Sequence, residues 1–148
     1  MSLPGVFFVQ LERRDKALHV GRLVEACFNR GQRLLIVVAN EEMATTLDRY
    51  LWTWKKDSFL PHVVINATGE PCNEPIVIST AEHNPNKAEV LICASPCSPS
   101  FFRDFQLIYD FAETYDPQLA DSARERFRLY RRQGFDPQME SLQPTPEQ

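Results

Sequence analysis

The sequence feature that most limits the fold is a continuous apolar run, LLIVVA, at residues 34–39. Apolar side chains at adjacent positions cannot alternate between a core and water, so this run is typical of a strand buried on both faces of its sheet. Such strands belong to mostly parallel sheets that carry helices on both faces. The run is also much shorter than the ~20 residues that cross a bilayer.

Patterns typical of helices and further strands surround this run. Apolar residues at helical spacing predict a helix over about residues 16–29, with Asp15 as its cap and Gly31 just past its end. A second helix is expected after Asn40, whose side chain can cap it. Further strands are predicted at residues 5–11, 76–79, 90–94 and 106–111.

A long final helix is predicted from Pro117 to Gly134, because proline is favoured in a first turn and glycine just past a last one. From Asp136 the sequence is polar and rich in proline and glutamine, which indicates a flexible tail over residues 136–148. The order of these elements predicts one α/β domain over residues 1–135. We expect three layers, with a mostly parallel sheet flanked by helices.

The composition fits a soluble globular protein, since 43% of the residues are hydrophobic and 24% are charged. The charges near the N-terminus follow its apolar run, the reverse of a secretory signal, so we expect a cytoplasmic protein. Cys27 and Cys93 lie in apolar segments, and the spacing of Cys93 and Cys97 fits neither a CxxC redox pair nor a zinc site. We therefore expect no metal site and no disulfide framework.

The turn that holds phosphate in many nucleotide-binding α/β folds has no glycine here. Residues 11–16 read LERRDK, and Glu12 and Asp15 would repel a phosphate. We therefore expect no nucleotide-binding loop and no cofactor. Asp110 and Glu113 lie near a strand end, where ion pairing or capping is commoner than catalysis. We expect no catalytic residue, and a small nucleotide-acting α/β enzyme is the alternative.

Arginines dominate the charge of the final helix. Five arginines against two acidic residues give it a net charge of +3, so the rest of the chain carries −7 of the total of −4. At ~100° per residue, Arg124, Arg128 and Arg131 form one ridge, with Phe127 at its border. The ridge could receive a peptide that ends in a hydrophobic residue and a carboxylate, although a solvated helix face fits the same pattern. The expected core face comprises Leu119, Ala123 and Tyr130.

Aromatic residues cluster between the second helix and the following strand. Trp54 continues the apolar stripe of that helix, so we expect it near the core, whereas Trp52 falls off the stripe. With Phe59 and Pro61, Trp52 could form an aromatic patch that anchors a protein partner, or the rings could be buried in the domain. Direct binding of single-stranded nucleic acid by base stacking is a further alternative, which the acidic body of the chain disfavours.

Three sequence blocks occur in a recognisable order: TLDRYLWTW (residues 46–54), SFLPH (residues 58–62) and ARERFRLYRRQGF (residues 123–135). Together they resemble the chi subunit family of bacterial DNA polymerase III holoenzyme, and weak similarity extends over residues 5–137. The resemblance implies a Rossmann-like fold without a nucleotide site. It implies a noncatalytic accessory subunit of the clamp loader, which acts in DNA replication at nucleoid-associated forks in the cytoplasm.

The resemblance also implies partners and the residues that bind them. The family binds the acidic C-terminal tail of single-stranded-DNA-binding protein, which ends in a hydrophobic residue and a free carboxylate. The matching positions here are Arg124, Phe127, Arg128, Arg131, Gly134 and Phe135. The family also binds the psi subunit or another clamp-loader component, and a repair helicase. The matching positions for these partners are Trp52, Phe59 and Pro61. DNA would be reached indirectly, and no membrane is involved.

Overall fold

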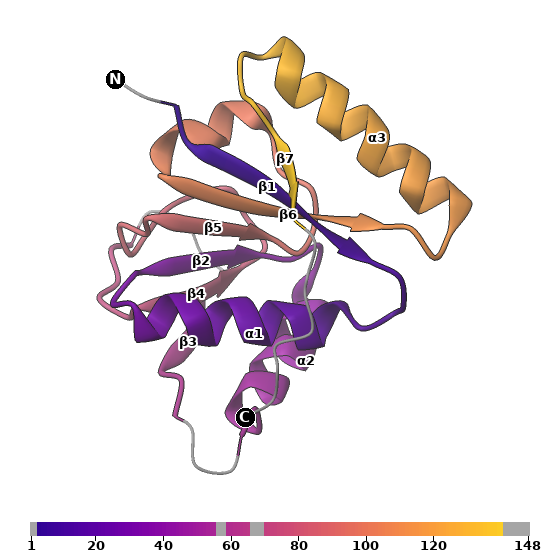
Figure 1. Ribbon diagram of the computed structural model, residues 1–148. Helices are drawn as coiled ribbons and strands as arrows, with labels where there is room; N and C mark the ends of the chain where they lie inside the picture. The colour runs from indigo at the N-terminus through magenta and orange to yellow at the C-terminus, as the bar shows by residue number, and fades with distance from the viewer. Residues whose placement is uncertain (1–2, 56–58, 66–69, 141–148) are drawn as a thin grey trace.

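Strands alternate with helices toward both ends of the chain, and three strands follow one another in its middle, as Figure 1 shows. The computed structural model describes residues 3–55, 59–65 and 70–140. Its elements are β1 (Gly5–Leu11), α1 (Lys16–Asn29), β2 (Leu34–Val37), α2 (Glu41–Trp52), β3 (His62–Ile65), β4 (Ile76–Ser79), β5 (Val90–Cys93), the 3-10 helix η1 (Pro99–Asp104), β6 (Leu107–Glu113), α3 (Pro117–Arg132) and β7 (Gln138–Glu140). The predicted strands and helices all occur, with bounds that shift by one or two residues.

The strands form one seven-stranded sheet in the order β3-β4-β2-β5-β6-β1-β7. All of the paired strands run parallel, so the predicted α/β fold with its flanked parallel sheet is confirmed. Strands β2, β4 and β5 are buried at every position, as their continuous apolar sequences predict.

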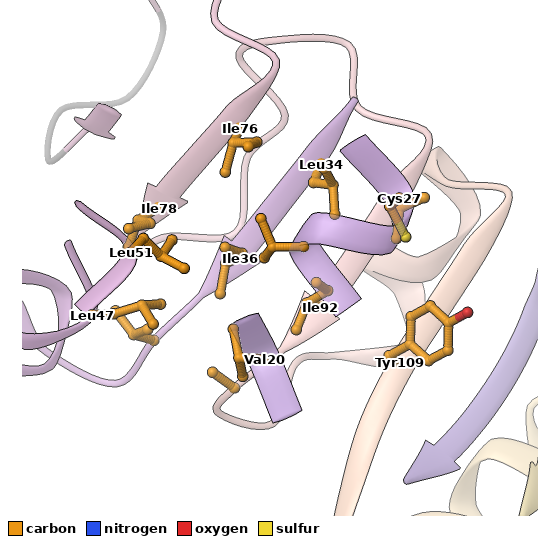
Figure 2. Packing of buried hydrophobic residues seen from close by; sticks show 14 of the residues in the cluster. Val20, Cys27, Leu34, Ile36, Leu47, Leu51, Ile76, Ile78, Ile92 and Tyr109 are labelled. Atoms are coloured by element: carbon orange, nitrogen blue, oxygen red, sulfur yellow. The ribbon is translucent and has the colours of Figure 1, made fainter. Parts of the chain in front are cut away.

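Helices cover both faces of the sheet, with α1 and α2 on one face and η1 and α3 on the other (Figure 1). Alternate residues of each strand serve the two faces. Ile36 and Ile92 pack toward α1 and α2 beside Val20 and Leu47, as Figure 2 shows. Leu35 belongs to the second cluster, under η1 and α3. No helix within the described ranges is long and apolar enough to cross a bilayer.

The ends of α2 and α3 follow from side-chain chemistry. Asn40 caps α2 as predicted, because its Oδ1 accepts a hydrogen bond from the Met43 backbone N–H at 2.8 Å. Asp116 caps α3 in the same way through the Leu119 N–H at 3.0 Å. Gly134 follows α3 with a φ of 99°, a left-handed conformation that favours glycine. The prediction that proline and glycine bracket this helix is therefore confirmed.

Asp15 precedes α1 but does not cap it, which corrects the sequence-based expectation. Its side chain makes no capping hydrogen bond. Instead, Asp15 Oδ1 lies 3.3 Å from Nε2 of His19, one helical turn along. The carboxylate thus interacts with a side chain of the helix rather than with the backbone of its first turn.

Two short strands were not predicted, β3 and β7. The predicted flexible tail begins at residue 136, but residues 138–140 form β7 and pair with residues 7–9 of β1, so its start is corrected. An edge strand is held by backbone hydrogen bonds and needs no apolar run. Phe135 and Pro137 are buried just before it and fix the chain there. Residues 141–148 of the predicted tail lie outside the described residues.

Candidate peptide-binding groove

A buried ionic network fixes helix α3 on the sheet. Asp110 of β6 is only 1% exposed. Its carboxylate accepts hydrogen bonds from Arg126 Nε at 3.0 Å and from the Tyr130 hydroxyl at 2.7 Å. It also accepts one from the Phe111 backbone N–H at 2.7 Å. A buried carboxylate is tolerated only when it is paired in this way, so Asp110 has a structural role and sets the rotation of α3 about its axis.

The network fixes the protonation states of Tyr130 and Arg126. Burial and the negative charge of Asp110 raise the pKa of Tyr130 well above its ordinary value. Burial alone would lower the pKa of Arg126, but the charge and hydrogen bonds of Asp110 outweigh that effect and raise it. The tyrosine therefore stays a hydrogen-bond donor and the arginine stays charged at neutral pH.

This rotation divides the arginines of α3 between the interior and the surface. Arg126 points to the sheet, whereas Arg124, Arg128 and Arg131 are exposed on the neighbouring side of the helix. Arg124 forms an ion pair with Asp121. Arg128 makes no ion pair within residues 3–55, 59–65 and 70–140. The predicted basic ridge is therefore present, with Arg128 available for an external anion.

A groove of about 400 Å³ lies between α3 and the β1–β7 edge of the sheet. Small side chains and one ring form its floor, and the guanidinium groups stand at its rim. The lining residues are Phe8, Ala112, Ala120, Ala123, Arg124, Phe127, Arg128, Arg131 and Met139. Apart from the arginine head groups the lining is apolar, which suits a ligand that has both an apolar part and a negative charge.

The structure brings four of the six residues predicted for tail binding to this groove: Arg124, Phe127, Arg128 and Arg131. Phe127 packs on Phe8 with ring centroids 5.5 Å apart. The guanidinium carbon of Arg131 lies 5.0 Å from the centroid of the Phe127 ring. This contact holds the arginine head group and the aromatic border side by side, as the helical-wheel argument predicts.

The other two predicted residues lie just beyond the helix. Gly134 is exposed at the turn that ends α3. Phe135 is buried, and its ring packs against Phe102 with centroids 5.5 Å apart. Leu119, which was expected on the core face, is exposed in the first turn of α3, so that part of the prediction is wrong.

Sequence reasoning missed the part of the groove that does not come from α3. Phe8 and Ala112 come from strands β1 and β6, and Met139 comes from the unpredicted strand β7. Met139 has polar neighbours at residues 138 and 140, so no apolar pattern marks it. Only the spacing of Ala120 and Ala123, one turn apart on one helix face, was a signal in the sequence.

The predicted aromatic patch lies at the other end of the strand order, beside β3. Trp52 is 50% exposed and Phe59 is 67% exposed, with ring centroids 5.8 Å apart. Pro61 is half-buried next to them. Trp54 instead packs against the core, as expected, and its ring covers Gly21 of α1. Trp52 and Phe59 thus form an exposed pair, and Trp54 is not part of it.

A buried histidine supports this pair. The centroids of the Trp52 and His62 rings lie 4.3 Å apart. Nδ1 of His62 is 2.6 Å from the Leu60 carbonyl oxygen, and Nε2 is 3.1 Å from Asp48 Oδ1. Because both ring nitrogens face oxygen atoms, the orientation of the imidazole is fixed. The Trp52 ring therefore packs on a rigid support.

The usual ligand position of this fold offers little polar chemistry. Lys16, in the turn after β1, donates to the Ala94 carbonyl oxygen at 2.8 Å and pairs with Glu113 at 3.1 Å, so both charges serve the fold. The hollow there, between α1 and α2, measures about 450 Å³ and is mostly apolar. Within the described ranges, no three acidic, histidine or cysteine side chains group closely enough to hold a metal ion.

Comparison with solved structures concerns the fold alone. The C-terminal domain of the DEAD-box protein Dbp5 superposes with a TM-score of 0.60 at 10% sequence identity. The match covers 94% of this chain and 90% of that chain. A parallel sheet with helices on both faces is therefore shared with a protein of unrelated sequence.

Comparison with known sequences is more specific. The DNA polymerase III subunit chi of Pseudomonas aeruginosa is 27% identical over 114 residues, which cover 77% of this chain and 78% of that protein. The subunit chi of Escherichia coli is 32% identical over 109 residues, covering 72% and 71%. The family model described as "DNA polymerase III chi subunit, HolC" matches residues 3–138. With this match over nearly the whole described chain, the protein belongs to the DNA polymerase III chi subunit family.

Proposed function

We propose that this chain is a noncatalytic accessory subunit that links the clamp loader to single-stranded-DNA-binding protein by binding its acidic C-terminal tail. The groove beside α3 carries the proposal, because three exposed arginines there border an apolar floor. The subunit would act in the cytoplasm at replication forks and reach DNA indirectly, through the coated strand.

The groove matches such a tail in two parts. Among the described residues, Arg124 pairs with Asp121 and Arg131 lies over the Phe127 ring, whereas Arg128 makes neither kind of contact. Its guanidinium group is therefore the best placed to form a paired hydrogen bond with the terminal carboxylate. The last side chain would then lie on the apolar floor beside Phe127. Arg124 and Arg131 would attract the acidic residues that precede it.

Binding of a single tail is expected to be weak, because few residues take part and the charges remain near water. A tetramer of single-stranded-DNA-binding protein displays several tails, so local concentration would raise the overall affinity. A weak and repeated contact of this kind suits a link that must be renewed along a coated strand.

The test is fluorescence anisotropy with a labelled acidic peptide that ends in Pro-Phe and a free carboxylate. Arg128→Ala should weaken binding by ~1–3 kcal/mol, since it removes a charge-assisted contact. Higher salt should weaken wild-type binding further. The same peptide capped as an amide should bind poorly, because the capping group removes the negative charge.

Arg132→Ala is the matched control. It removes the same charge from the same helix, but Arg132 does not line the groove. An equal loss of peptide affinity in the two variants would mean that Arg128 acts only through long-range electrostatic attraction, without a specific contact. Equal binding of the free acid and the amide would contradict the proposed contact with the carboxylate.

We also propose that the exposed pair of Trp52 and Phe59, with Pro61, binds the psi subunit or another clamp-loader component, and a repair helicase. Two large aromatic rings side by side in water are typical of residues that anchor a protein interface. The expected result is saturable binding of psi, and calorimetry with the purified subunit measures it.

A further inference from the structure

We infer that Met139, on edge strand β7, is a specificity-determining residue of the groove, which selects a large apolar side chain at the end of a bound acidic peptide. The inference rests on the proposed function and extends it to a residue outside α3. It concerns the wall of the groove that faces Phe127.

The pairing of β7 with β1 places this side chain. Met139 pairs with Phe8, and residues paired across neighbouring strands point to the same face of a sheet. Phe8 faces α3, where it packs against Phe127 and Tyr130. Met139 therefore extends the α3-covered face at the edge of the sheet, and it lines the groove with Phe8.

The floor of the groove is made of parts that cannot adapt. Phe8 is 1% exposed, and its ring is held between two other aromatic rings. Ala112, Ala120 and Ala123 are buried and too short to fill the space above them. Because this floor is itself nearly buried, most of the apolar surface that a terminal side chain could cover belongs to Phe127 and Met139. A small side chain would leave that surface in water, whereas a large one would cover it.

Met139 is the adaptable part of the lining. It is 51% exposed, so it has room to change rotamer. An unbranched thioether side chain moulds itself to an irregular apolar partner. Across the groove, Phe127 is held by the Arg131 head group and by Phe8. The last side chain of a bound peptide would thus pack between the fixed ring of Phe127 and the flexible side chain of Met139.

The charge of the groove is complementary to an anion, and the proposed function supplies the C-terminus of an acidic peptide as its occupant. Arg124, Arg128 and Arg131 all line the groove, on the α3 side. A carboxylate held by these arginines lies on the same Cα as the last side chain. The side chain is therefore directed from the arginine rim over the alanine floor, toward Met139.

The experiment measures the affinity of two free-acid peptides, identical except that one ends in Phe and the other in Ala. Both are titrated against the wild-type protein, Met139→Ala and Met139→Leu. We expect the wild type to prefer the Phe peptide by about tenfold, a typical discrimination by an apolar pocket. Met139→Ala should lose most of this preference by weakening the Phe peptide alone, and Met139→Leu should restore most of it.

Met43→Ala is the matched control, because Met43 is also an exposed methionine but lies on α2, away from the groove. It should leave both affinities unchanged, and thermal unfolding checks that each variant is folded. An unchanged preference in Met139→Ala, with normal binding of the Phe peptide, would overturn the inference and leave the proposed function standing. Failure of the wild type to bind either peptide would overturn both.

Discussion

At Asp110, one buried carboxylate joins helix α3 to the sheet through two side chains of different chemistry. Arg126 supplies a charge and Tyr130 a neutral hydroxyl donor. The arginine cannot be removed without leaving a buried charge unpaired, whereas loss of the hydroxyl leaves the ion pair intact. Replacement of Tyr130 is therefore the milder way to examine the network.

Tyr130→Phe should lower the free energy of unfolding by ~1–3 kcal/mol, because it removes one hydrogen bond to a charged group. Chemical denaturation at pH 7 measures the loss. Tyr50→Phe is the control, since the Tyr50 hydroxyl makes no hydrogen bond within the described part of the chain. An equal loss in both variants would mean that the contact with Asp110 adds nothing.

The same variant should change how stability depends on pH. The pKa of Tyr130 is raised in the folded protein, and a hydrogen bond to Glu113 raises the pKa of Tyr115 to about 12. An unfolded tyrosine loses its proton near pH 10. The stabilisation that each of these tyrosines gives to the folded state is therefore complete below pH 10 and is lost as the pH rises above it. Between pH 9 and 11, Tyr130→Phe should lose less stability than the wild type.

At the scale of elements, the sequence predicts those that have strong local signals. Helix α3 is bracketed by Asp116, Pro117 and Gly134, and its observed bounds follow these residues. Continuous apolar runs in the sequence predict the buried strands. Strand β7 (QME) lies at one edge of the sheet, where fewer side chains are buried, and its sequence carries no comparable pattern. Strand β3 at the other edge contains the apolar run VVI, a local signal from which no strand was predicted.

The candidate groove likewise has one part that the sequence predicts and one part that it does not. Its arginine rim lies on one helix, and ~100° steps are enough to place Arg124, Arg128 and Arg131 together. Its far wall depends on which strand pairs with β1, a contact between residues 8 and 139. No local pattern encodes a pairing over that distance in sequence. Met139 could therefore be placed only with the structure.

The contact between α1 and the end of α2 supports a prediction at this scale. A Cβ atom added at Gly21 would lie 2.4 Å from the Trp54 ring, far too close. Gly21→Ala should therefore destabilise the fold by ~1–3 kcal/mol, although alanine favours helices over glycine. Thermal unfolding measures the effect, and tryptophan fluorescence reports any displacement of the ring.

Ala26→Gly serves as the comparison on the same helix. Ala26 is exposed, so this change reports helix propensity alone and should cost ~1 kcal/mol. If Gly21→Ala instead stabilised the protein by a similar amount, the close packing of Trp54 on α1 would be contradicted.

At the scale of the whole molecule, the two candidate surfaces are separated by the full width of the sheet. The exposed pair of Trp52 and Phe59 lies beside β3, and the groove lies beside β7, which are the two edge strands. Charge is also unevenly distributed, with +3 on the final helix and −7 on the rest of the chain. An acidic ligand is thus drawn to one edge of the molecule.

This separation predicts independent binding. Trp52→Ala should weaken binding of psi and leave the affinity for the acidic peptide unchanged, whereas Arg128→Ala should weaken binding of the peptide and leave the affinity for psi unchanged. Calorimetry with each ligand, alone and with the other at saturation, measures both effects. Met43→Ala on the same helix as Trp52 is the control. Loss of both activities in either variant would indicate that the surfaces are coupled through the fold.

The short connection between α3 and β7 has a consequence for how this family of grooves can diverge. Residues 133–137 join the helix that carries the arginines to the strand that carries Met139, and within them Phe135 and Pro137 are buried. The distance between the two walls is thus set by one short, buried segment. Insertion or deletion of a single residue there would either displace Phe135 and Pro137 or shift β7 by one residue, which turns Met139 to the opposite face of the sheet. The length of this connection therefore constrains which side chain of β7 can line the groove with the arginines.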